Sequence, residues 1–224
     1  MSADAAGQLA FDIDTLIHDA DLQAQPPWAG PAPLHFASDY YTPTELDDAF
    51  RRWQFEHGTS ASIARSHMWH SIVTMDRANT NTPGHDLAVL SADLRCEHHG
   101  QDCHCVGAYL YRAICEPCHW HRDGDEHCVV EAWHDHAWPG WRSLPVVPAE
   151  IAHWDQQGRP SKCLTAWIDE HQPTDWHRPG APIITGRHPH GTRHVPGRSP
   201  WGGFDLSHTA LLSGPTDAAS LPTS

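Results

Sequence analysis

Five of the seven cysteines lie between residues 96 and 118, and this cluster constrains the fold more than any other feature of the chain. The pattern is Cys96-x6-Cys103-x-Cys105-x9-Cys115-x2-Cys118, and His134-x-His136 follows after fifteen intervening residues. Two cysteines at Cys-x2-Cys spacing converge on one ion from a tight turn, and a second pair of ligands completes a tetrahedral zinc site. The sequence therefore predicts a zinc-binding module over residues 96–136.

Cys115 and Cys118 form the first ligand pair, and two other pairs compete to complete the site. One is His134 with His136, near the end of an expected helix. On a regular helix their side chains diverge by roughly 200°, so both bind one ion only if the helix unwinds there. The other pair is Cys103 with Cys105, which would give a site resembling a zinc ribbon. Buried free thiols and a redox-active Cys-x2-Cys remain as alternatives.

The rest of the composition favours an α+β fold with additional short helices and long loops. Apolar residues make up 39% of the chain, and glycine and proline are numerous at 16 and 19. A core of this modest size gains stability from a structural metal ion. We expect one zinc-stabilised domain over residues 36–206, with disordered segments at 1–35 and 207–224.

Capping and periodicity predict the individual elements. A capping box starting at Thr42 and a stop at Gly58 indicate a helix between them. Asp123–Glu126 opens a second helix that runs to Ala137. The remaining expected elements are two strands of a small sheet and four shorter segments: strands 86–95 and 106–114, helices 62–72, 148–157 and 162–171, and a strand at 182–185.

Charge and targeting signals favour a soluble protein of the cytoplasm, or of the host cytoplasm if a phage encodes it. The formal net charge is −14, which argues against a non-specific grip on nucleic acid. The first residues lack the basic region and apolar core of a signal peptide. No run approaches the ~20 apolar residues of a membrane span.

Two segments suggest macromolecular partners. Gln8, Leu9 and Phe11 lie in a peptide, Gln-Leu-Ala-Phe, that resembles those which bacterial DNA-metabolism proteins insert into the sliding clamp. The segment GRHPHGTRHVPGRSPWGG carries Arg187, Arg193 and Arg198 and is the one clearly basic stretch of the sequence. Such a stretch can hold an anion, a phosphate backbone or an acidic partner.

An enzymatic alternative rests on Asp135-His136-Ala137-Trp138-Pro139. This segment resembles the Asp-His-x-x-Pro start of an HNH nuclease finger, in which the histidine is the general base and the preceding aspartate binds a divalent metal. The chain then departs from that family. It has no asparagine after Asn81 and no second Cys-x2-Cys, which puts nuclease chemistry in doubt.

Four segments together resemble an uncharacterised family carried by actinobacteria and their phages. They are SHMWH (Ser66–His70), the cysteine-containing run Cys103–Trp120, HDHAWPGWR (His134–Arg142) and GTRHVPGRSPWGGFD (Gly191–Asp205). The resemblance implies no activity, only a phage or prophage accessory protein. We therefore expect a non-enzymatic, zinc-stabilised protein that binds a macromolecular partner, with a metal-dependent nuclease or hydrolase as the alternative.

Overall fold

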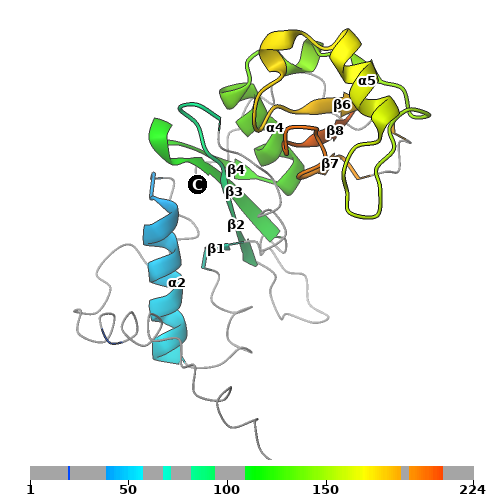
Figure 1. The fold of residues 1–224 in the computed structure, drawn as a ribbon. Helices are drawn as coiled ribbons and strands as arrows, with labels where there is room; N and C mark the ends of the chain where they lie inside the picture. Colours follow the sequence, from blue (N-terminus) through cyan, green and yellow to red (C-terminus); the bar gives the residue numbers. More distant parts are fainter. Residues whose placement is uncertain are drawn as a thin grey trace, which may run out of the picture.

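The computed structural model describes residues 39–57, 68–71, 82–93, 109–187 and 192–208, together with Ala20. Within these residues the chain forms an α+β fold of three α-helices and two four-stranded sheets (Figure 1). Among the described residues, no helix is both long enough and apolar enough to span a membrane. The helices and sheets of the described residues confirm the expected α+β class.

The first sheet is antiparallel throughout and has the strand order β1-β2-β3-β4. Its strands are His70–Ser71, Ala88–Asp93, Tyr109–Cys115 and Trp120–Gly124. The expected strands 86–95 and 106–114 contain β2 and most of β3. The sequence did not predict β4, which begins only two residues after Cys118 and makes the cysteine turn a hairpin connection rather than a strand-to-helix connection.

The second sheet has the order β5-β6-β8-β7 and mixes parallel and antiparallel pairs. Its strands are Val146–Val147, Ile183–Thr185, His194–Val195 and Asp205–Ser207. The last residue of β8, Ser207, falls at the start of the segment that was expected to be a disordered tail. Three short 3₁₀ helices complete the described part, at Glu116–Cys118, Trp141–Ser143 and Thr174–Trp176.

Hydrogen bonds from side chains to the first backbone amides fix where helices of this protein begin. Helix α2 (Pro43–His57) starts with a capping box, in which the Glu45 carboxylate accepts from Thr42 N at 2.8 Å and the Thr42 hydroxyl accepts from Glu45 N at 3.2 Å. Helix α4 (Glu126–Ala137) is capped by Asp125, which accepts from the first amides of the helix. Helix α5 (Lys162–His171) has the expected bounds.

The prediction of two helices is wrong for the residues that the structure describes. Residues 148–157 do not form a helix. The amides of Ile151 and Ala152 both donate to the Pro148 carbonyl and close a single turn, after which no helix continues. The expected helix 62–72 is described only over its residues 68–71, where His70 and Ser71 pair with β2 as strand β1. Pairing with an existing sheet edge outweighs the weak helical periodicity there.

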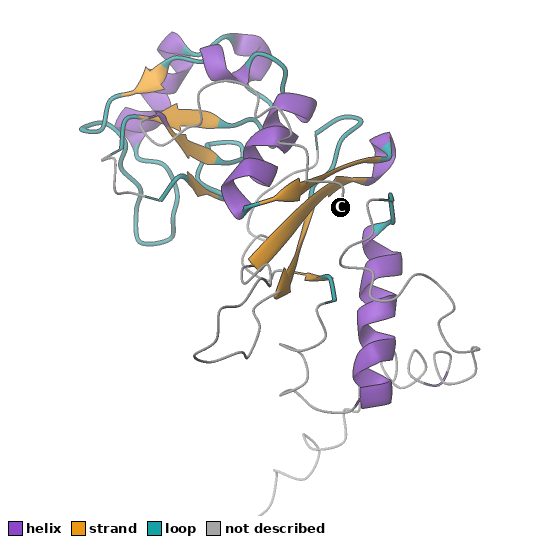
Figure 2. Ribbon diagram, turned by 180° about the vertical axis from the view of Figure 1, so that it is seen from behind, coloured by secondary structure: helices purple, strands orange, loops and turns teal. Residues whose placement is uncertain are grey.

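The first sheet is covered by helices on both faces (Figures 1 and 2). Successive residues of a strand point to opposite faces, and β3 shows this alternation clearly. Ala113 and Cys115 pack with α4, whereas Ile114 packs with Leu46 and Ala49 of α2. Cys115 is therefore directed at the face on which α4 lies.

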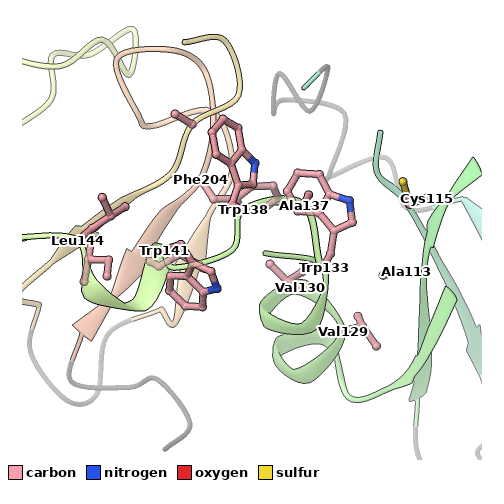
Figure 3. Close-up of a cluster of buried hydrophobic side chains, with 13 residues drawn as sticks. Ala113, Cys115, Val129, Val130, Trp133, Ala137, Trp138, Trp141, Leu144 and Phe204 are labelled. Carbon is pink, nitrogen blue, oxygen red and sulfur yellow. The ribbon is translucent and has the colours of Figure 1, made fainter. Parts of the chain in front are cut away.

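Helix α4 also packs against the second sheet, so that it lies between the two sheets. One apolar cluster contains Trp133 of α4, Ala113 and Cys115 of the first sheet, and Ile184 and Leu206 of the second. Figure 3 shows the side chains of α4 between Cys115 on one side and Phe204 on the other. The helix joins the two sheets into one core.

A buried cation lies on the α2 face of the first sheet. The Arg112 side chain is fully buried and forms two hydrogen bonds, of 2.6 and 2.7 Å, with the carboxylate of Asp123 directly across on β4. Its guanidinium also lies 4.9 Å from the centre of the Trp69 ring. A buried charge of this kind is tolerated only because it is paired.

We expect Asp123→Ala to lower the free energy of unfolding by about 3–5 kcal/mol, because it leaves the buried Arg112 cation without its carboxylate. Glu56→Ala is the matched control, since it removes the more exposed carboxylate of the helical pair with Arg52 and should cost about 0.5 kcal/mol or less. Urea denaturation of both variants measures the difference. Equal costs would contradict the assigned role of the Arg112–Asp123 pair.

Candidate metal centre

The Cys-x2-Cys segment forms a tight knuckle between β3 and β4. Strand β3 ends at Cys115, a single 3₁₀ turn covers Glu116–Cys118, and His119 adopts a left-handed conformation with φ 49° and ψ 37°. The His119 amide donates to the Glu116 carbonyl at 3.1 Å. This reversal of the chain brings the two thiol groups to the same neighbourhood, as a metal-binding knuckle requires.

A second turn places an imidazole beside both thiols. In the turn from Thr82 to His85, the His85 amide donates to the Thr82 carbonyl at 2.9 Å, and Gly84 has a φ of +82°. Glycine takes that conformation without the steric cost that a side chain brings. His85 Nδ1 lies 3.3 Å from Cys118 Sγ and 3.7 Å from Cys115 Sγ.

Helix α4 supplies a second imidazole, that of His136. The His136 ring stacks on the Trp120 indole, with centroids 4.7 Å apart and planes 5° from parallel. It meets the His85 ring edge-on at 4.9 Å. Among the described residues, the buried Nε2 atom of His136 finds no hydrogen-bond partner. A buried polar atom without a partner is rare in proteins, and a bound metal would satisfy it.

His85, Cys115, Cys118 and His136 together form a group that could hold a metal ion. One ligand atom from each lies within 4.8 Å of every other, so the four donors are gathered in one place. They come from three separate stretches of chain: the turn before β2, the β3–β4 knuckle and the last turn of α4. A metal bound by this group would tie those three stretches together.

The environment sets the protonation of the ligands when no metal is bound. Burial raises the pKa of the Cys115 thiol to about 11, so the thiol keeps its proton at neutral pH. Burial, followed by the neighbouring His85, lowers the pKa of His136 and leaves its imidazole neutral. The neutral imidazole of His136 could therefore bind a metal ion directly, whereas Cys115 would have to lose its proton on binding.

Asp86 connects the three stretches of chain that carry the ligands. It directly follows His85, and its carboxylate accepts from the Glu116 amide at 2.8 Å, at the start of the knuckle. Its carbonyl accepts from Trp133 Nε1 of α4 at 2.6 Å. Groups that orient ligands in this way contribute to metal affinity without touching the metal.

Three of the residues proposed from the sequence, Cys115, Cys118 and His136, come together in this cluster, but His134 does not. Helix α4 stays regular to Ala137, so the two histidines point apart. The fully buried His134 ring donates from Nδ1 to the Val130 carbonyl at 2.7 Å and packs among Trp133, Trp141 and Phe204. The pairing of His134 with His136 on one ion is therefore corrected: the helix does not unwind.

The competing pair, Cys103 and Cys105, lies outside the described residues. The structure instead brings in His85, which the sequence reasoning missed. A signal for it was present, because Thr82-Pro83-Gly84-His85 has turn chemistry immediately before an expected strand. Antiparallel pairing of the two expected strands would have placed that turn opposite Cys115.

Asp135 and His136, the two residues of the nuclease alternative, both contact neighbouring side chains. Asp135 Oδ1 accepts from Trp141 Nε1 at 2.8 Å and from Arg142 Nε at 2.9 Å, while its Oδ2 accepts from Arg142 at 3.0 Å. Both carboxylate oxygens are thus engaged by neighbouring donors. His136, the expected general base, faces the cysteine pair.

The three arginines of the basic stretch make contacts within the protein. Arg187 lies 3.5 Å from the buried carboxylate of Asp205, and Arg193 donates to Glu131 at 2.8 Å. The Arg198 guanidinium lies 4.9 Å from the Trp154 ring centre. Gln8, Leu9 and Phe11 of the expected clamp-binding peptide lie outside the described residues.

Comparison with known families assigns the chain to a family of unknown function. A model for a family of unknown function (DUF6349) matches residues 31–215, which is most of the sequence. The chain belongs to this family. Neither the curated proteins nor the solved structures contain a match. In this member of DUF6349, the group of His85, Cys115, Cys118 and His136 is a candidate metal site.

We expect His85→Ala to reduce the affinity for zinc or cobalt at least about tenfold, because it removes one of four donors. His153→Ala is the matched control, since His153 is exposed and outside the cluster. Competition with a chromophoric chelator measures both affinities. Unchanged affinity in His85→Ala would exclude this histidine as a ligand.

We expect Asp86→Ala to weaken metal binding by about 10–100-fold, because the knuckle loses an acceptor for the Glu116 amide. Asp86→Asn retains an oxygen acceptor and should recover most of the affinity. The thiolate-to-cobalt charge-transfer band of the cobalt-loaded protein reports the geometry of the site independently of affinity. A normal band and normal affinity in Asp86→Ala would refute the positioning role.

Proposed function

We propose that this protein is a zinc-stabilised, non-enzymatic accessory protein that acts by binding a macromolecular partner. The observation that carries the proposal is the four-donor group of His85, Cys115, Cys118 and His136. Two thiols and two imidazoles suit zinc better than the hard cations magnesium and calcium, which prefer oxygen ligands. Zinc is therefore the ion that we assign to this group.

The number of protein ligands supports a structural role for the ion. Catalytic zinc sites keep a coordination position open for water or substrate, whereas structural sites are closed by four protein ligands. Here four side chains converge, and none of them is a carboxylate that could shift aside. The occupied carboxylate of Asp135 also does not favour the nuclease alternative.

The setting that we propose is DNA metabolism in the cytoplasm, in a protein of phage or prophage origin. The peptide Gln8-Leu9-Ala10-Phe11 supplies the contact, with Leu9 and Phe11 entering apolar pockets of the sliding clamp and Gln8 hydrogen-bonding at the rim. A net charge of −14 makes a protein partner more plausible than a nucleic acid.

We expect elemental analysis of the purified protein to find one zinc per chain, and we expect removal of the zinc by a chelator to lower the thermal midpoint. Cys115→Ser should bind no zinc and melt at the temperature of the chelated protein. A chain that holds no zinc, or that cleaves DNA in the presence of magnesium or manganese, would contradict the proposal.

Binding to the clamp is tested separately. We expect fluorescence anisotropy to show the full-length chain binding a purified bacterial sliding clamp, with affinity reduced at least about tenfold in the double variant Leu9→Ala/Phe11→Ala. Ala5→Ser/Ala6→Ser in the same segment serves as the control. Equal affinity of both variants would remove this peptide from the proposal without affecting the zinc assignment.

A further inference from the structure

Strand β7 contacts the start of α4 through two histidines. The Nδ1 atoms of His127, in the first turn of α4, and of His194, in β7, lie 3.1 Å apart. The two rings meet edge-on, with centroids 5.1 Å apart. His194 is only 5% exposed, and His127 is half-buried. Because β7 lies at the edge of the second sheet, this contact supplements its pairing with β8.

The short distance between the two nitrogens limits how many protons the pair can hold. At 3.1 Å the contact is a hydrogen bond only when one Nδ1 carries a proton and the other offers a lone pair. Two neutral imidazoles meet this condition, and so does one imidazole beside one imidazolium. When both rings are protonated, two N–H donors and two positive charges face each other. The contact is therefore incompatible with the doubly protonated pair.

The surroundings of His127 oppose a proton on its ring. Burial lowers the pKa of His127, and the nearby His194 and Arg193 lower it further. The first amides of α4 add a partial positive charge beside the ring. Asp125 and Glu126 act in the opposite direction but do not outweigh these effects. His127 is thus held neutral while the contact is closed.

The carboxylate of Glu126 faces the other ring nitrogen of His194. It lies 3.6 Å from His194 Nε2, and this contact lowers the pKa of Glu126, so that the carboxylate stays ionised at pH 5.5. Because it is directed at Nε2, it does not separate the two Nδ1 atoms that face each other. The repulsion between two protonated rings therefore remains.

The other titratable groups around the pair come from α4 and β3. Burial lowers the pKa of His134 to about 3 and raises the pKa of Tyr111, so both stay neutral. Glu131 is ion-paired with two arginines. From β8, the residue paired with His194 is the apolar Leu206. The protonation that changes between pH 7.5 and 5.5 is therefore that of the two histidines.

We propose that the contact between His127 and His194 is an acid-sensitive switch that holds β7 on α4 at neutral pH and releases it at acidic pH. The second proton separates the rings, and β7 then moves away from the helix. Because the His194 ring also lies 5.9 Å from the Phe204 ring, its departure uncovers part of the apolar core. The inference goes beyond the proposed accessory function and does not depend on it.

The direction of the pH dependence follows from His127. Its pKa is lowered while the contact is closed and returns to about 6.5 once the rings separate. The closed form is therefore favoured above pH 6.5 and loses this advantage as the pH falls. Between pH 7.5 and 5.5 the equilibrium constant for opening rises by up to about tenfold.

Hydrogen–deuterium exchange of the full-length protein tests the switch. After correction for the intrinsic pH dependence of exchange, we expect peptides that contain β7 to exchange about three- to tenfold faster at pH 5.5 than at pH 7.5. Peptides from α5, which packs against β5, serve as the internal reference and should not change. Equal protection of β7 at the two pH values would overturn the proposal.

A variant separates the histidine pair from other effects of acid. His127→Gln keeps a hydrogen-bonding side chain beside His194 but does not titrate, so exchange in β7 should change less than about twofold between the two pH values. His153→Gln, at an exposed position, is the matched control and should respond as the natural chain does. Loss of a bound metal in acid would open β7 equally in all three proteins. An undiminished acid response in His127→Gln would therefore refute the switch.

A second measurement follows the protonation itself and does not require His127→Gln to fold. Nuclear magnetic resonance titration of the histidine rings should give His127 a pKa below 6.5. In His194→Gln this pKa should rise, because the variant removes a neighbour that becomes positively charged. A pKa of His127 at or above 6.5 in the natural chain, or one that His194→Gln leaves unchanged, would contradict the proposal.

Discussion

The burial of α4 between two sheets is the interaction on which the rest of the structure depends. Trp133 and the valines at 129 and 130 are fully buried, as are Trp138 and Trp141 just beyond the end of the helix. Burying each large apolar side chain contributes about 1.5–3 kcal/mol. Without this helix the first sheet would lose the cover on one face. The second sheet, whose strands have only two or three residues, would lose one of the helices that pack on it.

The candidate metal site depends on the same packing. Cys115 points at α4 because of the strand alternation that also directs Ala113 there, and His136 reaches the knuckle because α4 stays regular through its last turn. A metal held by His85, Cys115, Cys118 and His136 would close long loops of chain in a protein with a modest core. Cross-links that close loops reduce the entropy of the unfolded chain.

Charge is distributed unevenly between the surface and the interior. The chain carries a net charge of −14, yet several of its arginines are directed inward to carboxylates. Glu131, only 3% exposed, lies between Arg142 and Arg193 and so joins α4 to the segment before β7. The basic stretch that suggested an anion-binding surface therefore contributes largely to internal pairing.

The sequence by itself determined the elements that local chemistry controls. The capping box at Thr42, the Asp125 cap of α4, the full extent of α5 and the Cys115-x2-Cys118 turn all depend on neighbours within a few residues. Only the tertiary structure decided that His85 joins the metal-binding group and that His134 is packed in the core instead. Those choices depend on strand register and on how α4 is rotated against the sheet. Both are set by contacts between residues far apart in the chain, which spacing along the sequence does not reveal.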